Sequence, residues 1–138
     1  MEIQKYTHYV QYYETDKMGI THHSNYIRWM EEARDDFLRQ IGWDYAQLES
    51  EGIISPVVAV SCKYKHSTTF ADTIAITVGI EKYTGIKLCL KYDMTNEKGE
   101  TVCTGTSEHC FINEGGKIIQ INKDFPKFHE VLSELAQA

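Results

Sequence analysis

The sequence predicts an α+β fold, in which an antiparallel sheet is covered on one face by helix. Two patterns support this prediction. Between residues 26 and 41, apolar side chains recur at steps of three and four, which is the period of one helix face. From residue 57 onward the apolar period changes to two, the period of a strand, and the alternating runs are joined mostly by short polar connections.

The length and the composition fit one domain. The chain has 138 residues, of which 42% are hydrophobic and 25% charged, with two prolines and nine glycines. These values are typical of an ordered globular chain. A chain of this length buries about two-thirds of its unfolded surface in one core. We therefore predict a single domain over residues 1–138.

The long helix is predicted to begin near Asn25 and to run for about 17 residues, or roughly 25 Å. Its buried face is expected to consist of Tyr26, Met30, Ala33, Phe37 and Ile41. Its opposite face is expected to carry the charged residues Arg28, Glu31, Glu32, Arg34, Asp35, Asp36 and Arg39. Gly42 indicates the end of the helix, because glycine takes the left-handed cap conformation without a side-chain clash.

Strands are predicted on both sides of this helix, at residues 7–13, 57–65, 74–80, 88–94 and 101–112. The strands after the helix alternate apolar and polar residues, so we expect them to be half-buried. A short helix is predicted at residues 44–51, and Asp124 is predicted to cap a final helix.

Charge and hydropathy exclude several classes of partner. Twenty acidic and fourteen basic residues give a net charge of −6, and we predict no nucleic-acid partner because phosphate contacts need a basic surface. No run approaches the ~18 apolar residues of a membrane span, and the N-terminus lacks the apolar core of a signal peptide. We expect a cytoplasmic protein with no membrane partner. Its cysteines, Cys62, Cys89, Cys103 and Cys110, are then expected to be reduced thiols.

An acid-bearing turn precedes the long helix. The pattern there consists of Asp16, Gly19, Asn25 and Tyr26, followed by Glu32, Ala33 and Arg34. It resembles the D-x-x-G, N-Y and E-x-A-R motif of hotdog-fold acyl-CoA thioesterases, and is most similar to the 4-hydroxybenzoyl-CoA thioesterase group and to the thioesterases associated with the Tol-Pal system. The resemblance implies a hotdog fold, with the sheet wrapped around the helix. It also implies a homo-oligomer, either a dimer or a tetramer, with active sites where two subunits meet.

The implied reaction is the hydrolysis of acyl-CoA to a carboxylic acid and coenzyme A. A thioester is already activated, so the enzyme needs a carboxylate or an activated water at the carbonyl, and donors where negative charge grows. The resemblance implies that Asp16 is the nucleophile or general base and that the backbone N–H of His23 polarises the carbonyl. Gly19 lets the turn approach the substrate closely. Tyr26 and Met30 are candidates for the acyl pocket as well as for the core.

Coenzyme A is part of the substrate, so we expect no separate cofactor and no metal. Its phosphates must be bound by a few basic groups and loop donors in an otherwise acidic protein. The candidates are Lys63, Lys65, Ser67 and Thr68. The segment YKHSTTFAD resembles the family's Y-x-x-P-A-x-x-x-D, but Ser67 replaces the proline. Ordinary solvated strand lysines are the alternative interpretation.

Other interpretations stay open at the level of sequence. A hotdog domain without catalysis would bind acyl-CoA as a sensor, and acyl carrier protein is an alternative leaving thiol. Adjacent His22 and His23 permit a metal-dependent hydrolase. Its further ligands would be Glu14, Asp16 or His109, although adjacent histidines in an extended turn point apart and no H-x-x-x-H follows. Without its motif Asp16 would be read as a turn residue, and Glu14 as an acid facing solvent.

Overall fold

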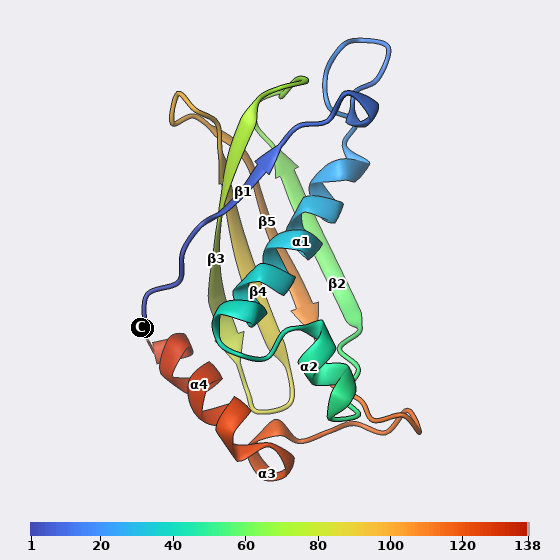
Figure 1. Ribbon diagram of the computed structural model, residues 1–138, viewed down its shortest axis with the longest axis vertical. Helices are drawn as coiled ribbons and strands as arrows, with labels where there is room; N and C mark the ends of the chain where they lie inside the picture. The colour runs from blue at the N-terminus through green and yellow to red at the C-terminus, as the bar shows by residue number, and fades with distance from the viewer. Residues whose placement is uncertain (138) are drawn as a thin grey trace.

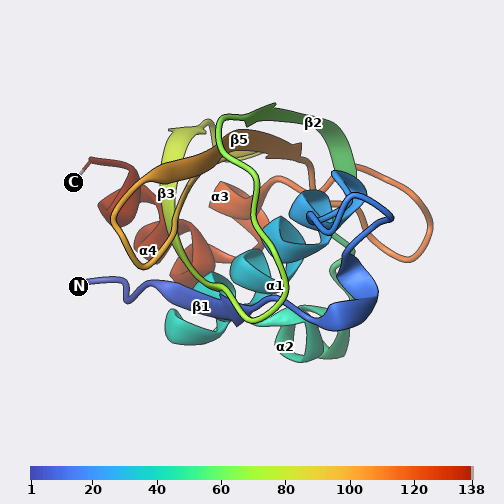
Figure 2. The same cartoon turned by 90° about the horizontal axis from the view of Figure 1, so that it is seen from above.

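The computed structural model describes residues 1–137 and confirms the α+β fold. Its strands are β1 (Tyr6–Tyr9), β2 (Val57–Tyr64), β3 (Thr73–Tyr83), β4 (Leu88–Thr95) and β5 (Thr101–His109). They form a five-stranded sheet in the order β1-β3-β4-β5-β2, and every neighbouring pair is antiparallel. The sheet curls around the long helix α1 (Ser24–Gln40), as Figure 1 and Figure 2 show.

Helix α1 has the predicted length and the predicted apolar face. It spans 17 residues, and its buried face consists of Tyr26, Trp29, Met30, Ala33, Phe37 and Leu38, with Ile41 just beyond. Gly42 follows at a φ of 85°, the left-handed conformation expected of a stop signal. The prediction is wrong for one charged residue: Arg34 is buried, with 5% of its surface exposed. Its guanidinium contacts His109 on β5 instead of pointing to solvent.

The shorter helices are the 3-10 helix η1 (Tyr12–Glu14) and the α-helices α2 (Tyr45–Ser50), α3 (Ile121–Asp124) and α4 (Pro126–Gln137). Helix α2 confirms the short helix predicted at residues 44–51, and the Asp44 carboxylate caps it by accepting from the Gln47 N–H at 2.9 Å. The prediction that Asp124 caps the final helix is wrong, because Asp124 is the last residue of α3. Pro126 begins α4 instead, because a helix has no use for the N–H of its first residue.

The first and last predicted strands are too long. β1 ends at Tyr9, and the chain then turns into η1, where the Glu14 carboxylate accepts from the Gln11 N–H at 2.8 Å. β5 ends at His109, and Ile112 makes only isolated bridges beyond it. In both places the side-chain alternation continues past the point where the backbone leaves the sheet.

Strand β2 forms the edge of the sheet beside α1 (Figure 2). It pairs with β5, and within residues 1–137 no strand pairs with its other side. The expectation that it is half-buried is wrong, because Val57, Val58, Val60 and Tyr64 are all 42–53% exposed. The inner strands β3 and β4 do bury alternate residues, as expected. Beside α1, the sheet therefore ends in an apolar, unpaired edge.

Candidate active site

The acid-bearing turn is closed by its own backbone. The Asp16 N–H donates to the Ile20 carbonyl at 2.9 Å, and the Gly19 N–H donates to the Asp16 carbonyl at 2.9 Å. Gly19 has a φ of 79°, a conformation that glycine adopts at little cost. Asp16 Oδ1 accepts from the Met18 N–H at 2.8 Å, which fixes the direction of the carboxylate. Its Oδ2 has no hydrogen-bond partner among the described residues.

Helix α1 begins directly after this turn. The Asn25 side-chain amide donates to the carbonyl of Glu14 at 3.0 Å and to that of His22 at 3.1 Å, so the helix start is tied to the chain before the turn. His23 is the N-cap residue. Its backbone N–H has no acceptor within the described residues. A free donor at the positive end of the helix dipole suits a developing negative charge.

Asp16 and His23 line one cavity of about 310 Å³. Its walls include Tyr26 of α1 and Tyr64 of β2, whose ring centroids lie 5.2 Å apart at 60°. The other lining residues come from the turn and from the end of β2 onward: Met18, Ile20, Thr21, Lys65, His66 and Ser67. The cavity therefore brings a carboxylate, a helix N-terminus, two aromatic rings and a basic segment around one space.

Thr68 lies behind this cavity and not on its surface. It is 2% exposed, and its hydroxyl lies 2.9 Å from the Tyr26 hydroxyl and 2.6 Å from the Thr21 hydroxyl. Next to it, the Thr69 hydroxyl donates to the Gly19 carbonyl at 2.7 Å. Burial raises the pKa of Tyr26, so its hydroxyl stays protonated. Through these contacts, Thr68 and Thr69 hold the acid-bearing turn in place.

Most of the site residues predicted from sequence lie together. Asp16, His23, Tyr26, Lys65 and Ser67 line the cavity, and Gly19 shapes its turn. Two do not line it. Met30 faces a second cavity further along α1, and the exposed Lys63 lies by β5 residues on the outer face of the sheet. The amino-acid pattern alone did not separate Lys63 from Lys65.

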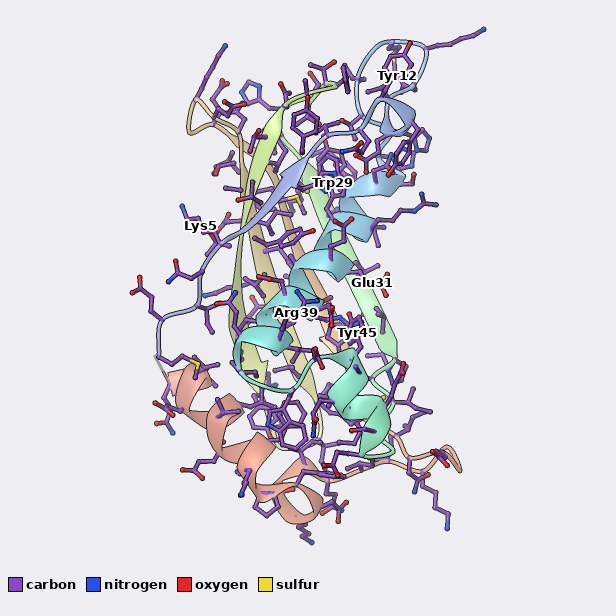
Figure 3. The ribbon with its side chains drawn as sticks, viewed as in Figure 1. Lys5, Tyr12, Trp29, Glu31, Arg39 and Tyr45 are labelled. Atoms are coloured by element: carbon purple, nitrogen blue, oxygen red, sulfur yellow. The ribbon has the colours of Figure 1, made fainter. Side chains whose placement is uncertain are left out.

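Glu14 is a polar residue whose place the sequence did not reveal. It is 4% exposed, and its carboxylate accepts from Trp29 Nε1 at 2.7 Å, lies 2.8 Å from His8 Nε2 and accepts from the Gln11 N–H at 2.8 Å. Figure 3 labels Trp29 on α1, beneath the turn. Burial alone would raise the pKa of Glu14, but the hydrogen bonds from Gln11, Trp29 and His8 outweigh it and lower the pKa. Glu14 is thus an ionised anchor between β1, η1 and α1.

The adjacent histidines do not form a ligand cluster. His22 Nδ1 lies 2.8 Å from the Ser24 hydroxyl, and the rings of His22 and His23 lie 4.4 Å apart. Within residues 1–137, no group of three His, Cys, Asp or Glu side chains is arranged to hold a metal ion.

In the same part of the chain, no helix is both long and apolar enough to cross a membrane.

The chain is similar to several known proteins. The family model described as the thioesterase-like superfamily matches residues 10–136. The chain is 38% identical over 130 residues to a putative acyl-CoA thioesterase of Bacillus subtilis, covering 94% of each chain. It is similar to the crystal structure of a DHNA-CoA thioesterase from Staphylococcus aureus, with 36% identity, a TM-score of 0.93 and coverage of 97% of this chain and 91% of that one. A gentisyl-coenzyme A thioesterase structure is 26% identical, with a TM-score of 0.80, and covers 87% of this chain and 97% of its own.

Proposed function

Because the chain belongs to the thioesterase-like superfamily of hotdog proteins, we propose that it hydrolyses the thioester of an acyl-CoA at the Asp16 cavity. The observation that carries this proposal is the meeting of Asp16 and the free N–H of His23 in one cavity. A carboxylate and an unpaired helix N-terminal donor are what thioester hydrolysis requires. The proposed reaction needs no further charged group at the thioester carbonyl.

In the proposed reaction, the thioester oxygen accepts from the His23 N–H while Asp16 acts through its free Oδ2. As a general base, Asp16 takes a proton from water as the water oxygen bonds to the carbonyl carbon. As a nucleophile, it forms an anhydride that water then cleaves. In both routes the C–S bond breaks, coenzyme A leaves as a thiol after protonation, and the acyl group leaves as the carboxylic acid.

Lys65, with His66 and Ser67, is proposed to bind the phosphates of coenzyme A. These residues follow β2 and line the cavity. All three are exposed, so they form a mouth rather than a sealed pocket. Lysine acts on phosphate as a point charge, and hydroxyl groups add directed donors.

We propose that the acyl group is aromatic. Its walls are the rings of Tyr26 and Tyr64, and two of the similar structures are named for the CoA esters DHNA-CoA and gentisyl-CoA. An aromatic acyl group would pack against these rings in the offset or edge-to-face manner that aromatic pairs favour.

The functional unit is proposed to be a homo-oligomer built on β2. The unpaired side of this strand and its exposed Val57, Val58 and Val60 lie beside the seam between α1 and β2. Pairing two β2 strands would bury the apolar edge, remove its free N–H and C=O groups, and close the site from outside. Light scattering should find a dimer or a tetramer; an active monomer would contradict this part of the proposal. All four cysteines are free thiols, which suits a reducing cytoplasm.

The test is the release of free thiol from a panel of short, long and aromatic acyl-CoAs, run with and without a chelator. We expect turnover of at least the aromatic esters and no effect of the chelator. Tight binding without turnover would favour the sensor, and a requirement for the acyl carrier protein ester would change the leaving thiol. Loss of activity with the chelator would favour the metal-dependent hydrolase. The Asp16→Asn variant, purified in the same way, is the control that measures thiol release by any contaminating esterase.

A further inference from the structure

A patch of exposed apolar side chains surrounds the seam between α1 and β2. It consists of side chains that are all 42–53% exposed, namely Ile27 of α1, Ile54, and Val57 and Val60 of β2. These residues line two open cavities of about 210 Å³ and about 190 Å³, and Glu31 and Arg34 line both of them. We call this surface, with its two charged residues, the seam patch. Exposed apolar surface gathered in one place is typical of a contact with another protein.

Arg34 is a buried cation in this patch, and no acid among residues 1–137 pairs with it. It is 5% exposed, and within the described residues no carboxylate oxygen lies within 4.0 Å of its nitrogens. Its hydrogen bonds all use Nη1, which donates to His109 Nδ1 at 3.0 Å and, more weakly, to Ser55 at 3.4–3.5 Å. A buried charge is costly unless an opposite charge lies beside it.

The groups that do contact Arg34 are neutral. Arginine can only donate, so His109 Nδ1 is an acceptor and the imidazole proton is on Nε2, which lies 2.7 Å from the Ser107 hydroxyl. Burial, and then the charge of Arg34, lower the pKa of His109 to about 3, so the imidazole is uncharged near neutral pH. The ring of Tyr45 covers the guanidinium from one side at 5.0 Å. These contacts hold the guanidinium in position and leave its positive charge uncancelled.

Two acids line the cavities of the seam patch. Glu49 of α2 lines only the larger cavity, whereas Glu31 lines both. Figure 3 shows Glu31 on the side of α1 next to β2. Its side chain is exposed, and its carboxylate has no hydrogen bond or ion pair within residues 1–137. The seam patch therefore carries an unpaired negative charge three residues, or about 4.5 Å of helix axis, from its unpaired positive charge.

A surface with one unpaired charge of each sign is complementary to a second copy of itself. In a contact between two identical subunits related by a two-fold axis, residue i of one subunit meets residue j of the other, and j meets i. The unpaired side of β2 suits such a contact, because two copies of an edge strand can pair antiparallel about a two-fold axis. The seam patch lies along this same edge, so strand pairing would bring two seam patches against each other.

The levels of the two charges along the strand fit this arrangement. The rings of Tyr26 and Tyr64 lie 5.2 Å apart, and from there eight residues of α1 and four residues of β2 each cover about 12–13 Å. Arg34 is therefore level with Val60, in agreement with the cavity that both residues line. If two β2 strands pair about Val60, the partner's Glu31 lies only about 4.5 Å from Arg34 along the strand, a distance that long side chains can span.

We propose that a second copy of this chain covers the seam patch and that Glu31 of the partner subunit forms an ion pair with Arg34, in both directions across the two-fold axis. This inference rests on the oligomer proposed above and deepens it, because it assigns the residues that select the partner and fix the register of the two β2 strands. The apolar side chains around the pair exclude water, so its charges attract more strongly than on an exposed surface. Neither charge takes part in the proposed reaction at Asp16.

The first experiment measures the mass of the assembly against protein concentration by sedimentation velocity. Glu31→Lys places a cation against Arg34 at two symmetric positions, so the concentration at which the assembly dissociates into halves should rise by about 100-fold or more. Glu81→Lys makes the same charge change at an exposed acid of β3, away from the seam patch, and should shift this concentration less than about threefold. Equal shifts in these two variants would overturn the inference, as would a larger shift in Glu49→Lys than in Glu31→Lys.

The second experiment mixes two dissociated variants. Arg34→Glu should also dissociate, because the new carboxylate faces the partner's Glu31. In an equal mixture with Glu31→Lys, each variant supplies the charge that the other needs, so mixed assemblies should form at concentrations within about tenfold of those for the unaltered protein. An ion pair confined to one chain gives no such rescue, so two folded variants that stay dissociated on mixing would overturn the inference. If Arg34→Glu does not fold, the comparison of Glu31→Lys with Glu81→Lys decides.

The unaltered protein separates this inference from the proposals on which it rests. An unaltered dimer or tetramer that Glu31→Lys does not dissociate would remove the ion pair alone. A monomer at every concentration would remove both the ion pair and the oligomer, and thiol release from acyl-CoA by that monomer would leave the proposed hydrolysis intact.

Discussion

Glu14 and Asp16 are carboxylates two residues apart, yet the fold gives them opposite surroundings. Glu14 is buried and has three donors around it: His8 of β1, the backbone N–H of Gln11 just before η1, and Trp29 of α1. Asp16 is partly exposed in a cavity, and a single backbone N–H holds one of its oxygens. Buried and held by three donors, the Glu14 carboxylate stabilises the fold and is out of reach of a substrate. The Asp16 carboxylate, with one oxygen unpaired and open to the cavity, is free to react, and Glu14 helps to secure its position.

The largest expected effect is on catalysis at Asp16. Asp16→Asn keeps the side-chain size and an oxygen for the Met18 N–H, but removes the charge that attacks the carbonyl or deprotonates water. We expect kcat to fall by about 10²–10⁴-fold, the usual contribution of a positioned acid or base, while the melting temperature changes little. Steady-state kinetics and thermal denaturation measure the two effects. A normal kcat in this variant would place the reactive group elsewhere.

The next effect is on stability at Glu14. Glu14→Gln leaves a neutral acceptor where His8, Trp29 and the Gln11 N–H need a charged one, and should lower the free energy of unfolding by about 1–3 kcal/mol, the range for buried hydrogen bonds to a charged group. Urea denaturation followed by fluorescence measures it. Glu97→Gln, at an exposed acid near β3, is a matched control with an expected loss under about 0.5 kcal/mol. Equal losses in both variants would show that Glu14 is not an anchor.

The same carboxylate should make stability depend on pH. Because its pKa is lower in the folded protein than in the unfolded chain, the unfolded state binds more protons in acid. Its contribution is therefore complete above the ordinary glutamate pKa of about 4.3 and is lost as the pH falls through its lower folded value. Denaturation curves from pH 7 to pH 3 should show a smaller acid loss in Glu14→Gln than in the unaltered protein. Parallel pH profiles would contradict the assigned pKa shift.

Contiguous patterns predicted much of this molecule, and long-range contacts account for the rest. Helix α1, Gly42 and the Asp16 turn were predictable because each depends on neighbours within a few positions of the chain. The burial of Arg34 depends on His109, which is 75 residues away, and that of Glu14 depends on Trp29 across the turn. Strand alternation likewise showed that β2 has two faces, but not that it lies at an edge. A single sequence does not reveal which distant polar groups meet.

A smaller effect is expected at the lysines of β2 and the segment after it. Lys65 lines the Asp16 cavity and Lys63 does not, so Lys65→Gln should raise KM for acyl-CoA by about 3–10-fold with kcat nearly unchanged. Its charge acts on the phosphates equally in the ground state and the transition state, which moves KM alone. Lys63→Gln is the matched control. If Lys63→Gln raised KM more than Lys65→Gln did, the phosphates would bind on the outer face of the sheet.

The mildest effect is expected at His23, whose proposed contribution is its backbone and not its ring. His23→Ala keeps the N–H at the start of α1, which has no acceptor among the described residues, and removes an exposed imidazole that lies 6.1 Å from the Tyr64 ring. We therefore expect kcat to fall less than about tenfold, far less than in Asp16→Asn, because the oxyanion donor is retained. Kinetics of both variants, with folding checked by circular dichroism, measure the difference. An inactive His23→Ala beside a nearly normal Asp16→Asn would mean that the imidazole, and not the carboxylate, is the reactive group of the cavity.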